Sequence, residues 1–196
     1  NVENRMRFMT ESIANIKKKA GDDFPIICRI AGMDPIPWGM GIEYWQEIAA
    51  ILEKAGVHAL EIYPRWHESR EPSVQMCVPR NAFVHVAEGI KKAVTIPVIA
   101  NVRINDPLDA EQILASGKAD FIGMARPLIA DPDLPNKARE GRVDEIRFCT
   151  ACCRCYDDIF SDRFMSCAVN PQAGREREYT IQRAPKAKEV FILGGG

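Results

Sequence analysis

Apolar and polar residues alternate along the chain in blocks that predict helices and strands in turn. Short apolar runs predict strands over residues 24–31, 58–63, 96–100 and 119–124. The segments between them predict helices over residues 3–19, 42–54, 81–93 and 107–116, with short helices at about 134–140 and 143–147. Gly21 and Gly56, just past two of these helices, are the expected stop signals.

This regular order of strand and helix predicts an α/β fold with a parallel sheet. Strands of four to eight mostly apolar residues are typical of sheets covered on both faces, and two architectures provide that cover, the doubly wound sheet and the (β/α)8 barrel. A barrel uses roughly 250 residues for its eight units, or about 31 for each. Residues 1–148 would therefore hold about half of a barrel.

Composition and charge exclude several classes of protein. The 196 residues are 46% hydrophobic and 27% charged, with a net charge of −1, so no basic field invites nucleic acid or an anionic membrane. The longest apolar runs are too short for a membrane span, and residues 1–8 lack the features of a secretory signal. We therefore expect a cytoplasmic protein without nucleic-acid or membrane partners.

The seven cysteines are unevenly distributed, and five of them lie between residues 149 and 167. A disulfide framework would be spread through a small secreted chain and would normally have an even count. A cluster in a chain without a secretory signal instead favours metal ligation. Cys28, in a predicted strand, and Cys77, in a predicted loop, are interpreted as a small buried hydrophobe and a free thiol.

The cysteine cluster has the spacing Cys149-x2-Cys152-x2-Cys155-x11-Cys167. Three thiolates spaced by two residues can surround one side of a cuboidal cluster, and a fourth arrives after a short excursion, which favours a [4Fe–4S] cluster. Zinc is the alternative, although four-cysteine zinc sites usually consist of two separated CxxC pairs. Cys153 is interpreted as a bystander, and a register that uses it stays open.

Four motifs occur in one chain order and carry a resemblance. They are WHESR at 66–70, RINDP at 103–107, GMARP at 123–127 and the cysteine spacing that ends in CAVNP at 167–171. Together they resemble the iron–sulfur flavoenzymes of the NADH:flavin oxidoreductase (old yellow enzyme-like) family. Within that family, WHESR favours the branch of bacterial 2,4-dienoyl-CoA reductases, whose relatives include trimethylamine dehydrogenase and the 2-enoate and bile-acid reductases.

The resemblance implies a chain that is a fragment of a larger enzyme. Residues 1–148 would be the C-terminal half of an FMN-binding TIM barrel, and residues 149–185 the [4Fe–4S]-binding segment and linker. Residues 186–196 would begin a Rossmann-like nucleotide-binding domain, the remainder of which would hold FAD and NAD(P)H. Val190–Leu193 would be its first strand, followed by the glycines at 194–196.

The resemblance also implies where FMN would bind. Arg29, at the end of a predicted strand, would lie beside the N1–C2=O edge of the flavin, where a guanidinium stabilises the negative charge of the reduced ring. A surface salt bridge is the alternative role for Arg29. The phosphate would be held after the last two strands by residues Arg103, Gly123, Met124, Ala125 and Arg126. Many relatives have glycine where this chain has Val102 and Ala125, so we expect weaker contacts between the backbone and the phosphate here.

His67 would be part of the acid pair that protonates the substrate, together with a tyrosine outside this chain. The other role considered for His67 is a loop histidine without chemistry. The implied enzyme reduces an activated C=C bond of a dienoyl-CoA or enoate, with electrons that pass from NAD(P)H through the cluster to FMN. An amine dehydrogenase of the trimethylamine dehydrogenase type and a non-catalytic iron–sulfur electron carrier are the alternatives, and an oligomer is compatible with each of them.

Overall fold

Helices and strands alternate along most of the chain in the computed structural model, which describes residues 1–66, 69, 74–182 and 184–193. The strands are β1 (Ile27–Ile30), β2 (Ala59–Ile62), β3 (Val98–Ala100) and β4 (Phe121–Ile122). The helices that accompany them are α1 (Val2–Ala20), α2 (Ile42–Lys54), α3 (Val84–Lys91) and α4 (Pro107–Ala115). The alternation predicted from the sequence is therefore confirmed, although the strands are shorter than predicted.

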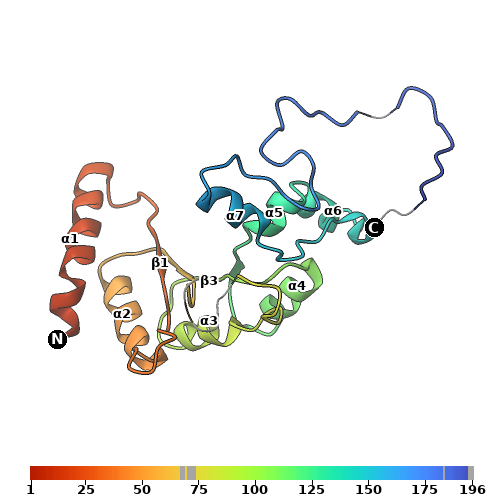
Figure 1. Cartoon of the computed structure of the whole chain (residues 1–196). Helices are drawn as coiled ribbons and strands as arrows, with labels where there is room; N and C mark the ends of the chain where they lie inside the picture. The colour runs from red at the N-terminus through yellow and green to blue at the C-terminus, as the bar shows by residue number, and fades with distance from the viewer. Residues whose placement is uncertain (67–68, 70–73, 183, 194–196) are drawn as a thin grey trace.

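The four strands form one parallel sheet in the order β1-β2-β3-β4 (Figure 1). Each new strand is added beside the previous one, and the order never reverses. A doubly wound sheet reverses its strand order at a switch point, whereas a (β/α)8 barrel adds its strands in sequence. The strand order therefore selects the barrel from the two architectures that the sequence left open.

The core lies between the sheet and the helices α2, α3 and α4, which follow one another along one side of it (Figure 1). Leu52 of α2 and Ile90 of α3 are fully buried there, as are Leu60 and Ile62 of β2. Each such side chain contributes about 1.5–3 kcal/mol by leaving water. These helix-facing side chains hold the strands in place.

The other face of the sheet is open in the part of the chain that the structure describes. Ile27 of β1 and Phe121 of β4 point to this face and are more than half exposed. In a closed barrel this face lines the interior, where side chains from all eight strands fill the space. Four strands do not enclose that interior, so its residues stay accessible.

After β4 the chain forms short helices that the sequence predicted only in part. These are α5 (Arg126–Ala130), α6 (Leu134–Arg139), the 3-10 helix η1 (Val143–Glu145) and α7 (Arg154–Phe160). Helix α7 lies within the cysteine segment. It begins between Cys152 and Cys155 and has the left-handed Cys153 as its N-cap.

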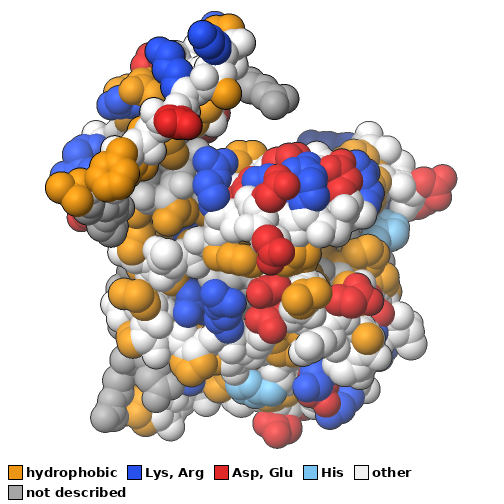
Figure 2. Space-filling view, turned by 90° about the vertical axis from the view of Figure 1, so that its right-hand side faces the viewer, with side chains coloured by type: hydrophobic (Ala, Val, Ile, Leu, Met, Phe, Trp, Pro, Cys, Tyr) orange, Lys and Arg blue, Asp and Glu red, His pale blue; other side chains and the backbone are white. Residues whose placement is uncertain are grey.

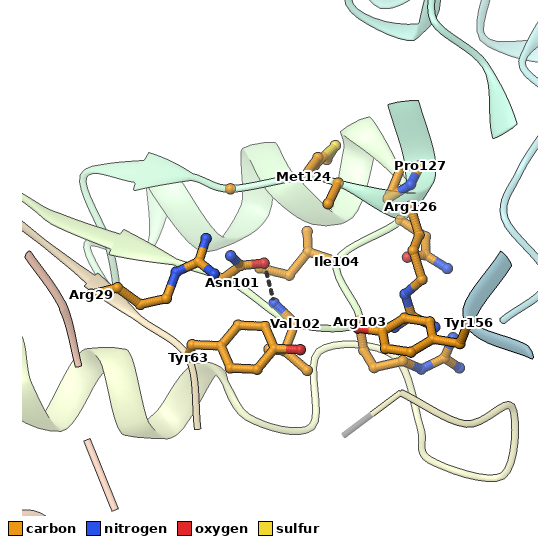
Figure 3. A pocket seen from close by; sticks show the side chains of 13 residues that line it. Arg29, Tyr63, Asn101, Val102, Arg103, Ile104, Met124, Arg126, Pro127 and Tyr156 are labelled. Atoms are coloured by element: carbon orange, nitrogen blue, oxygen red, sulfur yellow. Dashed lines mark hydrogen bonds between the residues drawn. The ribbon is translucent and has the colours of Figure 1, made fainter. Parts of the chain in front are cut away.

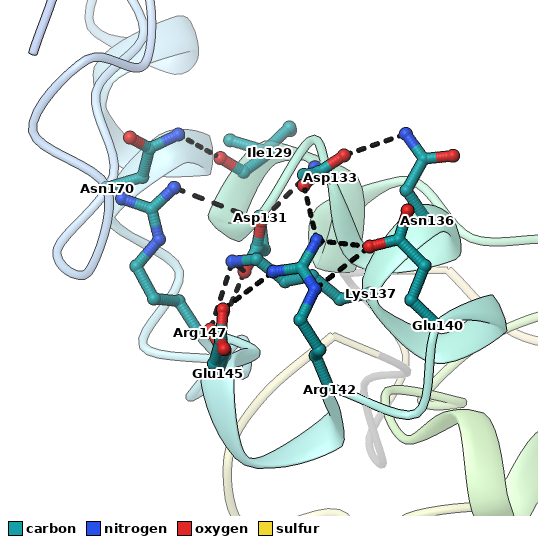
Figure 4. Close-up of polar contacts among 10 residues, drawn as sticks. All are labelled: Ile129, Asp131, Asp133, Asn136, Lys137, Glu140, Arg142, Glu145, Arg147 and Asn170. Carbon is teal, nitrogen blue, oxygen red and sulfur yellow. Dashed lines mark hydrogen bonds and ion pairs between the residues drawn. The ribbon is translucent and has the colours of Figure 1, made fainter. Parts of the chain in front are cut away.

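A network of charged groups around the buried carboxylate of Asp131 holds α5, α6 and η1 together (Figure 4). Lys137 donates to one carboxylate oxygen at 2.7 Å, and the backbone N–H of Arg147 donates to the same oxygen at 2.9 Å. Burial alone would raise the pKa of Asp131, but these hydrogen bonds outweigh it and hold the pKa below its ordinary value. Asp131 thereby fixes the path of the chain into the first cysteine.

Residues 189–193 form no strand in the structure, and Val190–Leu193 are exposed. A parallel strand needs a neighbour for its backbone hydrogen bonds, and no described residue pairs with this segment. No helix in the described part of the chain is long and apolar enough to cross a membrane. Acidic and basic side chains are interspersed on the face drawn in Figure 2.

We predict that Gly32→Ala lowers the free energy of unfolding by more than Gly117→Ala does. Both glycines have a positive φ, which costs other residues about 1–2 kcal/mol. A Cβ on Gly32 would also lie 2.7 Å from Val86 Cγ1, whereas nothing lies within 4 Å of one on Gly117. Overpacking should add about 1–3 kcal/mol for Gly32→Ala alone. Urea unfolding of both variants measures the difference, and equal losses would contradict the close approach.

Candidate functional site

A cavity of about 170 Å3 opens at the carboxyl ends of the strands (Figure 3). Active sites of barrel enzymes lie at this end. The cavity is lined by all six residues that the sequence placed at the flavin, which are Arg29, Arg103, Gly123, Met124, Ala125 and Arg126. It is also lined by Tyr63, Asn101 and Tyr156, which the sequence analysis missed. The structure thus brings together the six predicted residues, which are up to 97 positions apart in the chain.

Arg29 lies at one end of the cavity and is held by a carboxylate. Its Nε and Nη2 donate to the two oxygens of Glu61 at 3.0 and 2.9 Å, and its guanidinium lies 5.4 Å from the centre of the Tyr63 ring. The hydrogen bond with Glu61 raises the pKa of Arg29. Arg29 therefore lines the cavity and also forms an ion pair with Glu61, so the two roles considered for it occur together.

Arg103 and Arg126 lie at the other end of the cavity (Figure 3), and their hydrogen bonds go to carbonyl groups. Arg103 is buried and donates from Nε and Nη2 to the carbonyl of Val78, while Arg126 donates to the carbonyl of Val74. Neither guanidinium forms an ion pair with an acidic residue in the described part of the chain. Burial, with the charge of Arg126, lowers the pKa of Arg103. Among the described residues, this end of the cavity therefore carries positive charge without an acidic partner.

Val102 has a φ of 76°, in the left-handed region that a β-branched residue rarely adopts. The Asn101 side chain accepts a hydrogen bond from the Val102 N–H at 2.7 Å, and the Val102 side chain is buried against Val78 and Phe83. These contacts hold a conformation that glycine would adopt without strain. The backbone at this position thus keeps the form that the expected glycine would favour. Ala125 has a negative φ, so the absence of glycine there imposes no such strain.

The RINDP motif connects the cavity to the cysteines. Arg103 lines the cavity, and the Asn105 side chain donates to the carbonyl of Cys149 at 2.9 Å. Asp106 caps α4 by accepting from the Leu108 N–H, and Pro107 occupies the first turn of that helix, where its missing N–H is not needed. One loop therefore positions a cavity arginine, a helix and the first cysteine.

The four predicted ligands Cys149, Cys152, Cys155 and Cys167 line a second, mostly apolar pocket. Arg126 lines this pocket as well as the cavity, so the two sites adjoin. The Ala151 N–H donates to Cys149 Sγ at 3.4 Å, as backbone amides do around cluster sulfurs. Within the described residues no three Cys, His, Asp or Glu side chains are grouped to hold a single metal ion. Cluster ligation by these cysteines therefore stays a prediction.

Cys153 also borders this pocket, but its thiol is engaged elsewhere. Its Sγ lies 3.5 Å from the carbonyl oxygens of Val74 and Ala151, to which a thiol would donate. Burial raises its pKa, which favours the protonated form. These contacts agree with the interpretation of Cys153 as a bystander.

Asp158 of α7 holds the fourth cysteine near the other three. The Ser166 N–H and hydroxyl both donate to Asp158 Oδ2, and the Arg163 Nε donates to Oδ1 at 3.1 Å. The hydrogen bonds of Ser166 and Arg163 lower the pKa of the buried Asp158 to about 2. Because Ser166 precedes Cys167, this carboxylate sets where the chain returns to the pocket. Nothing in the cysteine spacing indicated it.

Tyr156 connects the cysteine segment with the cavity that it lines. Burial and its hydrogen bond with Tyr63 raise the pKa of Tyr156 to about 12, so the hydroxyl stays protonated. The Arg126 guanidinium lies 5.8 Å from the centre of its ring. A tyrosine directly after a predicted ligand was the only sequence signal that could have indicated it.

The predicted acid His67 lies outside the described residues. Of the other two histidines, His58 accepts from the Ile26 N–H at 3.0 Å, and His85 contacts the Ala82 carbonyl through Nδ1. Both histidines thus contact backbone groups, His58 one that is 32 residues away and His85 one in the preceding turn.

A parallel sheet with barrel strand order and a site at the strand ends defines the class of (β/α)8-barrel enzymes. The chain belongs to the NADH:flavin oxidoreductase / NADH oxidase family, which it matches over residues 1–145.

Three relatives illustrate the range of that family. The chain is 45% identical over 98% of its length to a metal reductase of Desulforamulus reducens, of which it covers 29%. It matches the structure of a 2-naphthoyl-CoA reductase bound to 2-naphthoyl-CoA with a TM-score of 0.90 and 38% identity, over 95% of this chain and 29% of that one. It matches histamine dehydrogenase from Rhizobium sp. 4-9 with a TM-score of 0.79 and 29% identity, over 90% of this chain and 25% of that one. The chain spans about three tenths of the length of such relatives.

We predict that Asp158→Asn destabilises the chain at neutral pH and that this loss shrinks in acid. The pKa of Asp158 is about 2 in the folded state and about 3.9 in an unfolded chain. The carboxylate therefore stabilises the fold above pH 4, and the effect disappears as the pH falls through 2. Urea unfolding between pH 7 and pH 2 measures the difference between wild type and variant.

Asp157→Asn is the matched control, because it removes an exposed carboxylate from the same helix. Its effect on stability should be small. A difference between Asp158→Asn and wild type that persists undiminished at pH 2 would contradict the assigned role of the Asp158 charge.

Proposed function

We propose that this chain contributes to an FMN- and [4Fe–4S]-dependent oxidoreductase that reduces the activated C=C bond of a 2,4-dienoyl-CoA or related enoate with electrons from NAD(P)H. The family membership supports flavin chemistry. We propose in addition the roles of the site residues, the binding of the cluster and the substrate class.

The distribution of charge in the cavity is the observation that carries the proposal. Arg103 and Arg126 at one end have no acidic partner among the described residues, whereas Arg29 at the other end is neutralised by Glu61. A ligand with a doubly charged phosphate at one end and a nearly neutral ring at the other fits this distribution. FMN is such a ligand, and Tyr63 in the middle of the cavity offers an aromatic face to its ring (Figure 3).

The backbone beside Arg126 adds further donors for a phosphate. The N–H groups of Met124 and Ala125 donate to no other described residue, and both residues line the cavity. Gly123, just before them, allows the backbone to approach the Asn101 side chain closely, because a Cβ there would lie 3.1 Å from the Asn101 amide. Backbone N–H groups together with a guanidinium form the usual phosphate site after the last strands of a barrel.

The residues of the cysteine segment fit an iron–sulfur cluster by their chemistry. Four thiols line one apolar pocket, and an amide N–H already points at one sulfur. Burial raises the pKa of Cys155, a cost that bonding to iron would offset. When bound, a cluster supplies one-electron transfer and FMN supplies hydride transfer. The chain's residues would hold the two groups on either side of Arg126 and exclude water between them.

The substrate class follows from chemistry that a relative shares. The structure with a TM-score of 0.90 is a 2-naphthoyl-CoA reductase that holds an aromatic acyl-CoA. We propose that this chain helps to bind an enoyl or dienoyl thioester above the flavin and that His67 provides a proton to the substrate carbon. A histidine is suited to this role because its pKa lies near neutral pH.

The proposed arrangement along the chain has three parts. Residues 1–148 would be the C-terminal half of the FMN barrel, residues 149–185 the cluster segment and linker, and residues 186–196 the start of a nucleotide-binding domain. That domain would bind FAD and NAD(P)H and would deliver electrons to the cluster.

An amine dehydrogenase is the second candidate, because histamine dehydrogenase shares the fold at 29% identity. Mixing the flavin-loaded protein with each substrate in the absence of oxygen distinguishes the two candidates. A reductase holds a reduced flavin that an enoyl-CoA reoxidises, whereas an amine dehydrogenase holds an oxidised flavin that a methylated amine bleaches. Bleaching by the amine without reoxidation by the thioester would overturn the proposed substrate class.

We predict that Arg126→Gln weakens FMN binding roughly 10- to 100-fold, the equivalent of losing about 1.5–3 kcal/mol of hydrogen bonding to a charged group. Affinity for riboflavin, which has the same ring without a phosphate, should change little. Fluorescence titration of the deflavinated protein with each ligand measures both values.

Arg80→Gln is the control for this substitution, because Arg80 is paired with Asp106 and does not line the cavity. It should bind both ligands as the wild type does. An equal loss for FMN and riboflavin in Arg126→Gln would contradict a phosphate role for Arg126.

We also predict that changing Cys149, Cys152, Cys155 and Cys167 together to Ser abolishes iron binding and NAD(P)H-driven reduction of the enoyl substrate. Flavin reduced directly with dithionite should still be reoxidised by the thioester. Iron content, brown absorbance and the two reactions are measured separately. Cys153→Ser is the matched control and should keep its iron, because that thiol faces two carbonyls. A quadruple variant with full NAD(P)H-driven activity would contradict the relay.

A further inference from the structure

Glu61 contacts polar side chains from both of the strands that flank β2. Glu61 lies on β2, where its register partner on β1 is Arg29 and its register partner on β3 is Ile99. Successive side chains of a strand point to opposite faces, so Asn101, two residues after Ile99, lies on the same face as Glu61. The register thus brings a cation, a carboxylate and an amide together at the cavity.

Glu61 bridges the other two side chains. Its two oxygens accept the Arg29 Nε and Nη2, and Oε1 also accepts from Asn101 Nδ2 at 2.5 Å. The Glu61 side chain is 19% exposed, whereas that of Arg29 is 61% exposed. The carboxylate therefore lies beneath the guanidinium and holds it against the cavity.

The amide of Asn101 is fixed at both of its ends. Its nitrogen donates to Glu61, and its oxygen accepts the N–H of the strained Val102 (Figure 3). Glu61 therefore connects the orientation of Arg29 with the backbone that leads to Arg103.

We infer that Glu61 is a positioning residue that sets the charge presented by Arg29 to the flavin ring and thereby lowers the reduction potential of the bound flavin. This inference rests on the proposed FMN site. A reduced flavin carries negative charge near N1, which a nearby uncompensated cation stabilises. A carboxylate paired with that cation cancels part of this stabilisation and keeps the reduced flavin a stronger donor.

The test is the midpoint potential of the flavin in the complete FMN-loaded protein. Glu61→Gln keeps the shape of the side chain and removes its charge. We expect the ratio of reduced to oxidised flavin at a fixed solution potential to rise roughly tenfold. For a two-electron couple, this is an increase of about 30 mV in the midpoint potential. Glu61→Asp, which retains the charge, should stay near the wild-type potential.

Two further variants separate charge from structure. Glu53→Gln is the matched control, because Glu53 also accepts several hydrogen bonds, from Thr95 and Ile96, at a place that does not line the cavity. Its flavin potential should equal that of the wild type. Arg29→Gln alone leaves the Glu61 carboxylate unpaired, whereas the double variant Arg29→Gln/Glu61→Gln has neither charge. The flavin potential of the double variant should therefore lie nearer to the wild-type value than the flavin potential of Arg29→Gln does.

The outcomes are distinguishable from failure of the proposed function. A wild-type protein that binds no flavin would overturn the FMN site itself. A flavin-loaded Glu61→Gln with an unchanged potential would overturn the role of Glu61. If Glu61→Gln does not fold, the double variant decides, and a potential equal to that of Arg29→Gln alone would overturn the inference.

Discussion

The register of the four parallel strands is the constraint on which the rest of the structure depends. Because parallel strands end at the same edge of a sheet, the residues that follow them meet there even when they are far apart in the chain. Arg29 and Glu61 are register partners, and Arg103 and Arg126 follow the next two strands. The buried residues between sheet and helices hold this register, since a slip of one residue would turn every side chain to the other face.

The cavity separates compensated from uncompensated charge. One arginine is paired with a carboxylate at the strand ends, while two arginines donate, within the described part of the chain, to carbonyl groups in the loops beyond them. Isolated buried charge is costly, and such a cost is retained where a bound anion supplies the partner. The strained Val102 and the buried Arg103 lie in the same loop, so conformational strain and uncompensated charge are concentrated where a ligand would bind.

The cysteine segment is built onto the barrel through polar contacts with few apolar ones. Asp131 fixes the chain before Cys149, Asn105 holds the Cys149 carbonyl, and Asp158 returns the chain to Cys167. Tyr156 and Arg126 then connect this segment to the cavity. The cavity and the cysteine pocket therefore adjoin at Arg126, which lines both of them.

The sequence by itself determined the alternation of strand and helix, the family, and six of the residues that line the cavity, because hydrophobic periodicity and short motifs are local properties. It did not determine Tyr63 and Asn101 as cavity residues or Glu61 as the partner of Arg29, since a polar residue in a strand shows no partner until its neighbouring strand is in register. Helix α7 and the Asp158 contacts were also missed, because cysteine spacing masks helical periodicity and Ser166 is eight residues away. Only the tertiary structure decided how charge is divided within the cavity, because that division depends on contacts between strands.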